Sequence, residues 1–224
     1  MKLALFDLDG TLLPTDSDHA FGEFMVEIGW VDGAAWRARN DAFYAHYQAG
    51  TLNLAEYLDF ATSAWRDRPR EEAEAARQRF MREVIEPRLH DQARALVDAH
   101  FEAGDQVAIV TATNEFVTRP IASAFGVEQL LAVDLERDDN GRVTGRSTGV
   151  PTFREGKVTR VEAWLAAQGR QWADFDDVLF YSDSTNDLPL LERVRTPIAT
   201  NPTPALEAIA RERGWRIIKL FDTP

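Results

Sequence analysis

The segment KLALFDLDGT, residues 2–11, decides the fold. Its first half, Lys2–Phe6, is a short apolar run that ends at an Asp-Gly turn, which predicts a buried strand. Asp7 and Asp9 follow at positions i and i+2 of extended chain, so their side chains point to the same side. In open α/β sheets, ligands bind at this carboxyl end of a strand. The same stretch also fits a solvated turn, because Asp and Gly are common turn residues.

Beyond this segment, the pattern predicts a helical insert followed by alternating strands and helices. Residues 17–85 contain no convincing strand, and a helical stretch of roughly 70 residues is too long to be a loop. Pro120 either kinks a helix near residues 115–125 or delays its start. Further strands are expected at residues 107–110, 130–133, 178–181, 197–199 and 216–219.

This alternation predicts an α/β fold with a doubly wound, mostly parallel sheet covered by helices on both faces. We expect residues 1–13 and 88–224 to form this Rossmann-like core. Residues 14–87 would form an inserted all-helical cap. Asp139-Asn140-Gly141 indicates a hairpin turn within the second half of the chain.

Composition excludes several classes of function. The chain has 224 residues, with 25 Lys and Arg against 37 Asp and Glu, which gives a net charge of −12. Such a field repels phosphate backbones and anionic membranes, so we expect neither nucleic acid nor a membrane as a partner. Without cysteine there is no disulfide, thiolate metal site or Cys nucleophile. With no signal-peptide pattern and no membrane-length apolar run, we expect a cytoplasmic protein, monomeric or homodimeric.

A second acidic segment, residues 181–187 (YSDSTND), follows the strand expected at 178–181. By itself it also fits an Asx turn with a helix N-cap. Because it ends another parallel strand, it should lie at the same sheet edge as the first segment. Like charges brought that close repel unless they share protons or a cation, and oxygen ligands with phosphate chemistry favour Mg²⁺. The converging carboxylates would be those of Asp7, Asp9, Asp183 and Asp187.

Two weaker signals lie between these acidic segments. Thr111 closes a predicted strand, and its hydroxyl with the amides of Ala112 and Thr113 could hold a phosphate oxygen. A threonine there also fits a simple cap. Lys157, near the start of a predicted helix, suits a phosphate as a compact charge but also fits an exposed surface position.

Together these segments resemble a known family. The DLDGT stretch at residues 7–11, Thr111, Lys157 and residues 182–187 are similar, in order and spacing, to the four motifs of the haloacid dehalogenase superfamily of phosphohydrolases. The helical insert resembles that superfamily's C1 cap. The chain is most similar to the phosphoserine-phosphatase-like subfamily IB, which also includes histidinol-phosphate phosphatases.

The resemblance implies a role for each matching residue. Asp7 would be the nucleophile that forms an aspartyl-phosphate, and Asp9 would act as general acid and then general base. The phosphoryl oxygens would be held by Thr111, Ala112, Thr113, Lys157 and Asn186. The Mg²⁺ ligands would be Asp7, the backbone carbonyl of Asp9 and Asp183, with Asp187 bound outside them or through water. The reaction implied is Mg²⁺-dependent hydrolysis of a small phosphomonoester.

The cap departs from the phosphoserine phosphatases. Asp16 matches the acidic residue that receives the substrate ammonium, but Ala61 stands where that subfamily carries an arginine for the serine carboxylate. Arg66 and Arg68 are the candidate replacements. A carboxylate site without its cation discriminates poorly, so we expect another small phosphomonoester. An amine-bearing substrate such as histidinol phosphate fits, because Asp16 and Asp18 could receive an ammonium.

Alternative functions use the same residues. Phosphoserine phosphatase activity stays open, and a phosphotransferase would pass the phosphoryl group from the same aspartyl-phosphate to an alcohol. A non-enzymatic receiver-like switch also uses clustered acids, Thr and Lys, but it lacks an acid two residues after the phosphoacceptor and lacks a helical insert. His19 lies near the first segment and could face the site, although a surface position on a cap helix is the preferred interpretation.

Overall fold

Strand β1 (Leu3–Phe6) lies inside a six-stranded parallel sheet in the computed structural model, which describes residues 1–221. The strand order is β3-β2-β1-β6-β7-β8. Phe6 is in register with Ile109 on one side and with Tyr181 on the other, so the three strands end at one edge. The other strands are β2 (Gln106–Asn114), β3 (Leu130–Val133), β6 (Val178–Ser182), β7 (Thr196–Thr200) and β8 (Arg216–Ile218).

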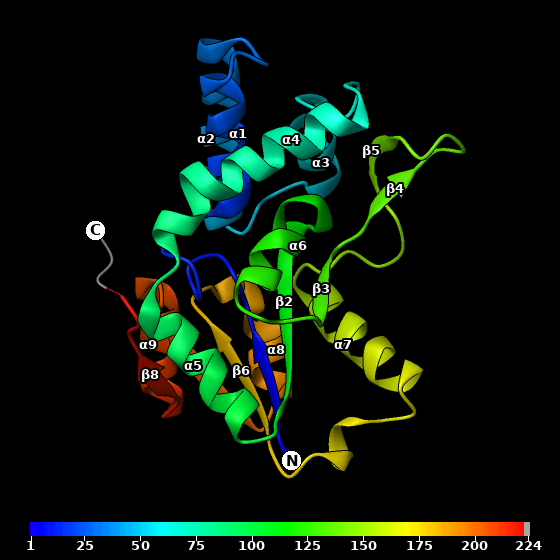
Figure 1. The fold of residues 1–224 in the computed structure, drawn as a ribbon. Helices are drawn as coiled ribbons and strands as arrows, with labels where there is room; N and C mark the ends of the chain where they lie inside the picture. Colours follow the sequence, from blue (N-terminus) through cyan, green and yellow to red (C-terminus); the bar gives the residue numbers. More distant parts are fainter. Residues whose placement is uncertain (222–224) are drawn as a thin grey trace.

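Helices cover both faces of the sheet, which confirms the predicted doubly wound α/β fold (Figure 1). The side chains of β1 alternate between two hydrophobic clusters, because successive strand residues point to opposite faces. Ala4 and Phe6 join one cluster and Leu3 and Leu5 the other. The first cluster includes side chains of α5 (Asp91–Glu102) and α6 (Glu115–Ala124). The second includes side chains of α7 (Glu155–Ala167), α8 (Leu188–Arg193) and α9 (Pro204–Arg213).

The segment between β1 and α5 is helical, as the sequence indicates, and lies beyond the carboxyl edge of the strands (Figure 1). Asp16 caps the first helix and Asn53 the third, because each side chain accepts hydrogen bonds from backbone N–H groups of the first turn. The helices are α1 (Ser17–Glu27), α2 (Gly33–Gln48), α3 (Leu54–Ser63), α4 (Arg70–Phe80), the π-helix η1 (Met81–Ile85) and the 3₁₀ helix η2 (Glu86–Arg88).

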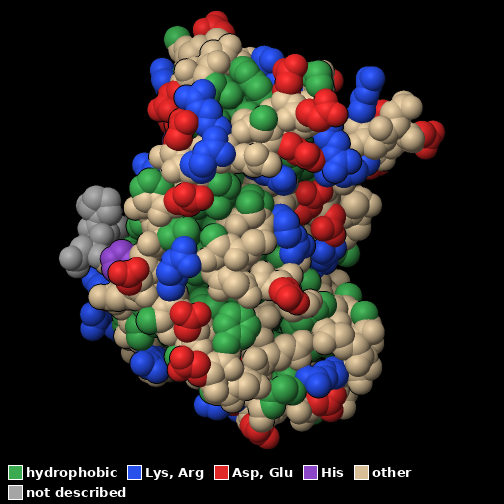
Figure 2. All heavy atoms as spheres, in the orientation of Figure 1, with side chains coloured by type: hydrophobic (Ala, Val, Ile, Leu, Met, Phe, Trp, Pro, Cys, Tyr) green, Lys and Arg blue, Asp and Glu red, His purple; other side chains and the backbone are tan. Residues whose placement is uncertain are grey.

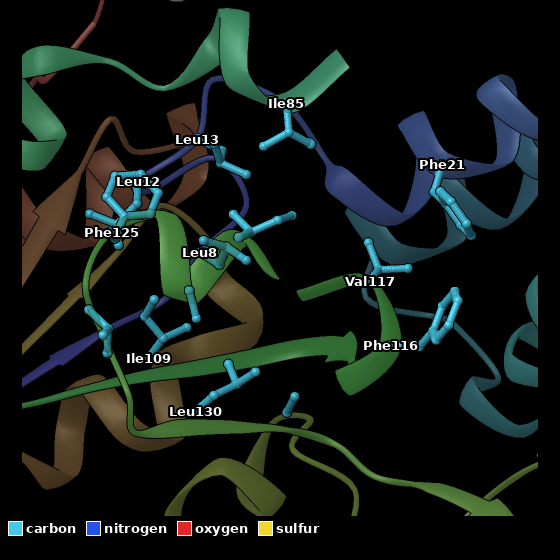
Figure 3. Close-up of a cluster of buried hydrophobic side chains, with 14 of the residues drawn as sticks. Leu8, Leu12, Leu13, Phe21, Ile85, Ile109, Phe116, Val117, Phe125 and Leu130 are labelled. Atoms are coloured by element: carbon cyan, nitrogen blue, oxygen red, sulfur yellow. The ribbon is translucent and has the colours of Figure 1, made fainter. Parts of the chain in front are cut away.

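Aromatic side chains join these helices to the sheet. Phe21 of α1 contacts Phe80 of α4 with ring centroids 4.9 Å apart, and it lies 6.1 Å from Phe116 of α6. Trp65 stacks on Phe116 at 4.0 Å. Figure 3 shows Phe21 and Phe116 beside the aliphatic side chains that cover the sheet. The hydrophobic core is therefore continuous from the sheet into the helices above it.

Pro120 does not delay the start of α6, which begins at Glu115 and contains Pro120 in its interior. Proline has no N–H, so the carbonyl four residues earlier, that of Phe116, loses its helical partner. Arg77 of α4 supplies a replacement donor, with Nη1 3.1 Å from the Phe116 oxygen. The helical segment thus satisfies a backbone group that a proline leaves free.

The expected hairpin is present as β4 (Leu135–Arg137) and β5 (Val143–Ser147), an antiparallel pair whose connection contains Gly141. It lies against α3, because a Cβ on Gly145 would meet Arg66 Nη1, which is bound to Asp59. Short 3₁₀ helices η3 (Trp172–Asp174) and η4 (Thr185–Asp187) complete the architecture. Within residues 1–221, no helix has both the length and the apolar character needed to cross a membrane.

Candidate active site

The turn after β1 brings the two acidic segments together. The Asp7 amide donates to the Tyr181 carbonyl of β6 at 2.9 Å, which continues the strand pairing by one residue. Gly10 then reverses the chain with a φ of 77°, a backbone conformation that favours glycine. A Cβ on Gly10 would lie only 2.4 Å from Oδ2 of Asp183, so the Asp183 carboxylate packs directly on this turn.

Lys157 is buried between two carboxylates, with 1% of its side chain exposed. Its Nζ lies 2.7 Å from Oδ1 of Asp7 and 2.7 Å from Asp187. Ser182 donates a further hydrogen bond of 2.8 Å to Asp187. Burial opposes the lysine charge, but Asp187 and Asp7 outweigh it and raise the pKa of Lys157. The lysine therefore stays protonated and holds one oxygen of Asp7 in place.

Asp9 faces away from this ion pair. Its Oδ2 accepts from the Thr113 hydroxyl at 2.9 Å, and its Oδ1 accepts from the Ser17 amide at 2.8 Å. Burial, together with the charges of Asp16 and Asp7, raises the pKa of Asp9 well above its usual range. A carboxyl group in this setting holds its proton more readily than an exposed one, as suits a general acid.

Asp7 and Asp183 approach each other at the end of the central strands. The Thr11 hydroxyl lies 3.4 Å from Oδ2 of Asp7 and 3.3 Å from Oδ1 of Asp183. Burial and the neighbouring charges of Asp7 and Asp187 raise the pKa of Asp183 well above its usual range. Burial raises the pKa of Asp7 to about 6 against the opposing effect of Lys157. Three carboxylates around one lysine leave uncompensated negative charge, and oxygen donors of this kind fit a hard divalent cation.

The residues expected to bind phosphate lie in two places. Thr111, Ala112 and Thr113 line a cavity beside Asp7 and Asp9, and the Thr111 hydroxyl accepts from the Thr113 amide at 3.1 Å. Asn186 does not line this cavity, and its amide donates to the Tyr47 carbonyl at the end of α2 at 2.9 Å. Asn186 thereby ties the edge of the sheet to the helical segment.

The cavity has a volume of about 540 Å³, including space open to solvent. Four aspartates line it, two from the strand end and two, Asp16 and Asp18, from the start of α1. No Lys or Arg of residues 1–221 is among its lining residues. Its aromatic wall consists of Phe43, Tyr44, Tyr47, Tyr57 and Phe153. Carboxylates and aromatic faces both attract cations, so the cavity suits a positively charged group.

Asp16 and Asp18 differ in their surroundings. Oδ1 of Asp16 accepts from the amides of Asp18 and His19, at 3.1 and 2.8 Å, as the N-cap of α1. Asp18 is buried and accepts from the Asn114 amide at 3.1 Å. Burial raises the pKa of Asp18 to about 7, with a further contribution from the Asp16 charge. His19, a partly exposed residue of α1, also lines the cavity, so it faces the site.

The two arginines considered as carboxylate ligands lie outside the cavity. Arg66 binds Asp59 at 2.6 Å, and Arg68 stacks over Trp30 with its guanidinium carbon 4.0 Å from the ring centroid. Both line a separate cleft beside α4. Ala61 does not line the cavity either. Among the described residues, therefore, no Lys or Arg lines the cavity to receive a substrate carboxylate.

The aromatic wall was not predicted from the sequence. Tyr44 and Tyr47 come from α2, whose apolar residues show no clear helical face. Phe153 comes from the loop before α7. The clustering of Phe43, Tyr44 and Tyr47 within one helical turn was the available signal. Burial raises the pKa of Tyr47 well above its usual range, so its hydroxyl remains protonated.

A group of potential metal ligands lies on the helices away from the sheet edge. Ligand atoms of His19, Glu23 and Asp41 fall within 4.8 Å of one another. However, Arg37 binds Glu23 at 2.8 Å, and His19 Nε2 is already 2.9 Å from Asp41. The guanidinium supplies the positive charge that a metal would otherwise bring, so we assign no metal to this group.

The chain is similar in sequence and in structure to phosphatases of one family. The sequence model of the haloacid dehalogenase-like hydrolases matches residues 4–192. A histidinol-phosphatase of Neisseria meningitidis is 41% identical over 217 residues, covering 97% of this chain and 98% of the relative. A Bordetella pertussis protein of unknown function has a solved structure that superposes with a TM-score of 0.93 at 50% identity, covering 98% and 99% of the two chains. A substrate-bound phosphoserine phosphatase has a TM-score of 0.69 at 20% identity, covering 98% and 93%, and shares the fold.

Proposed function

Because the chain belongs to the haloacid dehalogenase-like hydrolase family and is a phosphatase of phosphomonoesters, we propose that its substrate carries a cationic group, with histidinol phosphate as the candidate. The observation that carries this proposal is the cavity beside Asp7. It contains Asp16 and Asp18 among aromatic side chains, and no Lys or Arg of residues 1–221 lines it. Its charge therefore favours an ammonium or imidazolium and disfavours a substrate carboxylate.

The lining of the cavity supports histidinol phosphate over phosphoserine as the substrate. Both substrates carry an ammonium that Asp16 or Asp18 can receive, but only phosphoserine carries a carboxylate. A buried carboxylate beside other carboxylates and without a Lys or Arg partner is strongly disfavoured. The imidazole of histidinol phosphate instead can pack on the rings of Tyr44 and Tyr57. The resemblance to the Neisseria histidinol-phosphatase supports the same choice.

The reaction we propose proceeds in two displacements. A carboxylate oxygen of Asp7 attacks phosphorus, the ester P–O bond breaks, and the leaving oxygen takes the proton from Asp9. Asp9 then removes a proton from water, which attacks the aspartyl-phosphate and releases inorganic phosphate, restoring Asp7. Lys157 would orient the attacking carboxylate through its 2.7 Å contact, and Thr111 with the amides of Ala112 and Thr113, which line the cavity, would donate to the phosphoryl oxygens.

We propose Mg²⁺ as the cofactor, held by the carboxylates of Asp7 and Asp183 and the backbone carbonyl of Asp9. When bound, the ion neutralises phosphoryl charge and orients the reacting groups. Asp187, which binds Lys157 and accepts from Ser182, would act outside the direct ligands or through a bridging water. Asn186 binds the backbone of α2, so we propose that it couples the helical segment to the phosphate site.

We propose that residues 14–87 act as a cap over a catalytic core of residues 1–13 and 88–224, of which 222–224 lie outside the described residues. The cap would exclude water from the phosphoryl group and select the leaving group. With a net charge of −12, a small-molecule ester is a better partner than nucleic acid or an anionic membrane. We propose a cytoplasmic protein, monomeric or homodimeric.

A substrate panel tests the proposal. Histidinol phosphate, phosphoserine and an artificial aryl phosphate are assayed with Mg²⁺ and with EDTA. We expect kcat/KM for histidinol phosphate to exceed that for phosphoserine by about a hundredfold or more, since an uncompensated buried charge is at stake. EDTA should abolish all three activities. Equal rates for phosphoserine would contradict the cavity argument, and undiminished activity in EDTA would contradict the metal assignment.

A further inference from the structure

A second, larger cleft lies outside the cavity beside Asp7. It has a volume of about 1340 Å³, including space open to solvent, and it runs between the start of α4, the first turn of α6 and the β4–β5 hairpin. Six arginines line it: Arg66, Arg68, Arg70, Arg77, Arg137 and Arg142. The acidic residues in its lining are three, Asp67, Glu74 and Glu115. A cationic cleft in a protein of net charge −12 is a local exception that needs an explanation.

Internal ion pairs use only part of this positive charge. Arg70 binds Glu74 at 2.7 Å, and Arg137 binds Glu115 at 3.2 Å. The ion pairs formed within residues 1–221 include neither Arg77 nor Arg142. Lys and Arg side chains gather on the face shown in Figure 2, among Asp and Glu side chains of the upper helices and the hairpin. Two guanidinium groups thus remain available to an external anion.

Arg77 is built into the cleft. Its guanidinium carbon lies 4.7 Å from the centroid of Phe116, and Nη1 donates to the Phe116 carbonyl. Its Nε is buried and has no hydrogen-bond partner. A buried donor without a partner costs free energy, and a bound acceptor would remove that cost. Trp65 and Phe116 form an apolar floor, at 5% and 7% exposure, which strengthens any ion pair made above it.

We infer that this cleft binds a small polyanion carrying at least two phosphate or carboxylate groups, with Arg77 and Arg142 as its principal contacts. The two arginines come from different parts of the chain, Arg77 from α4 and Arg142 from the turn that precedes β5. A bound polyanion would therefore connect the helical segment to the hairpin. Two anionic groups on one ligand can each pair with one of these guanidinium groups.

The test uses inorganic pyrophosphate as the probe and calorimetric titration of the full chain in EDTA. We expect saturable binding by the wild type that weakens as NaCl is raised. Arg142→Gln, on an exposed side chain, should weaken binding about tenfold or more, the loss expected for a charge-assisted contact. Arg77→Met keeps the contact with Phe116 and should weaken it similarly. Turnover without pyrophosphate should be unchanged in the Arg142→Gln variant.

Arg213→Gln is the matched control, because Arg213 is paired with Glu192 outside the cleft and its loss should leave the titration unchanged. Absence of pyrophosphate binding by the wild type would overturn the inference. So would equal binding by the wild type and Arg142→Gln, because Arg142 would then not contact the bound pyrophosphate. Equal weakening by Arg213→Gln would show a nonspecific effect of charge and would also overturn it.

Discussion

The ammonium of Lys157 lies 2.7 Å from Oδ1 of Asp7, although 150 residues separate them in the chain. The same ammonium binds Asp187, so one buried cation stands between two buried acids. This contact fixes Asp7 beside the cavity and favours its ionised form. Removing either partner of such a pair leaves an uncompensated buried charge. The contact between Lys157 and Asp7 therefore affects the stability of the protein as well as its function.

Replacement of the nucleophile is the first test of this site. Asp7→Asn keeps the side-chain shape but cannot form an aspartyl-phosphate, so we expect kcat to fall about a thousandfold or more. Asp139→Asn, an exposed position in the β4–β5 connection, is the matched control and should retain full activity. Melting temperatures of both variants check the fold. Near wild-type turnover by Asp7→Asn would rule out the assignment.

The contact between Gly10 and Asp183 gives a test of packing. Gly10→Ala would place a Cβ 2.4 Å from Asp183 Oδ2, in addition to the strain of a φ of 77°. Gly126→Ala has a similar φ of 71° with nothing within 4 Å, so it isolates the backbone strain. Each should lose about 1 kcal/mol of unfolding free energy from that strain. We expect Gly10→Ala, but not Gly126→Ala, to lose Mg²⁺-dependent activity as well.

If Gly10→Ala and Gly126→Ala lose the same amount of activity, the loss in Gly10→Ala does not come from displacement of the Asp183 carboxylate. The measurements are denaturant unfolding curves and the Mg²⁺ concentration that gives half-maximal turnover.

The role of Asp16 in substrate selection can be separated from its role as a cap. Asn is as good an N-cap as Asp, so Asp16→Asn should preserve the start of α1. We expect its KM for histidinol phosphate to rise about tenfold, the size of one charge-assisted contact, with little change in KM for an aryl phosphate. Steady-state kinetics with both substrates measure this difference. A parallel rise in both KM values would assign Asp16 to the fold alone.

Asp18 provides a pH-dependent prediction. Burial raises its pKa from 3.8 to about 7 in the folded protein. Between these values the folded state binds more protons than the unfolded state, so the wild type loses stability as the pH rises, until the loss is complete above about pH 7. Asp18→Asn lacks this titration. Its unfolding free energy relative to the wild type should therefore increase from about pH 4 to about pH 7 and then stay constant.

Denaturant unfolding across this pH range measures the unfolding free energy of Asp18→Asn relative to the wild type. Asp139→Asn is the control, and its unfolding free energy relative to the wild type should not show this rise between about pH 4 and about pH 7. A pH-independent difference for Asp18→Asn would mean that Asp18 ionises normally in the folded protein.

The sheet and its acidic edge could be predicted because they follow from local patterns. A short apolar run before Asp7 and another before Ser182 are enough to place both segments at strand ends. In parallel neighbours such ends share one edge, and β1 lies directly beside β6. The alternation of strands and helices then determined the doubly wound class.

Contacts that depend on three-dimensional packing could not be predicted. The tyrosines of α2 reach the cavity only because of how α2 packs, and its sequence carries no clear apolar face. The effect of Pro120 on its helix was ambiguous from the sequence. The Phe116 carbonyl that it leaves without a helical donor is bound by Arg77, which is 39 residues away in the chain. Asn186 was expected at the phosphate, but its amide meets the Tyr47 backbone, a partner 139 residues away.

The phosphorylated form of Asp7 offers the most direct measurement. In Asp9→Asn the new amide can accept from the Ser17 amide through its oxygen and donate to the Thr113 hydroxyl through its nitrogen, but it cannot activate water. With an aryl phosphate, whose leaving group needs no proton, the aspartyl-phosphate should form and persist. Rapid quenching and peptide mass spectrometry should then place one phosphoryl group on Asp7. A phosphoryl group on any other residue, or none with any substrate that is turned over, would contradict this account.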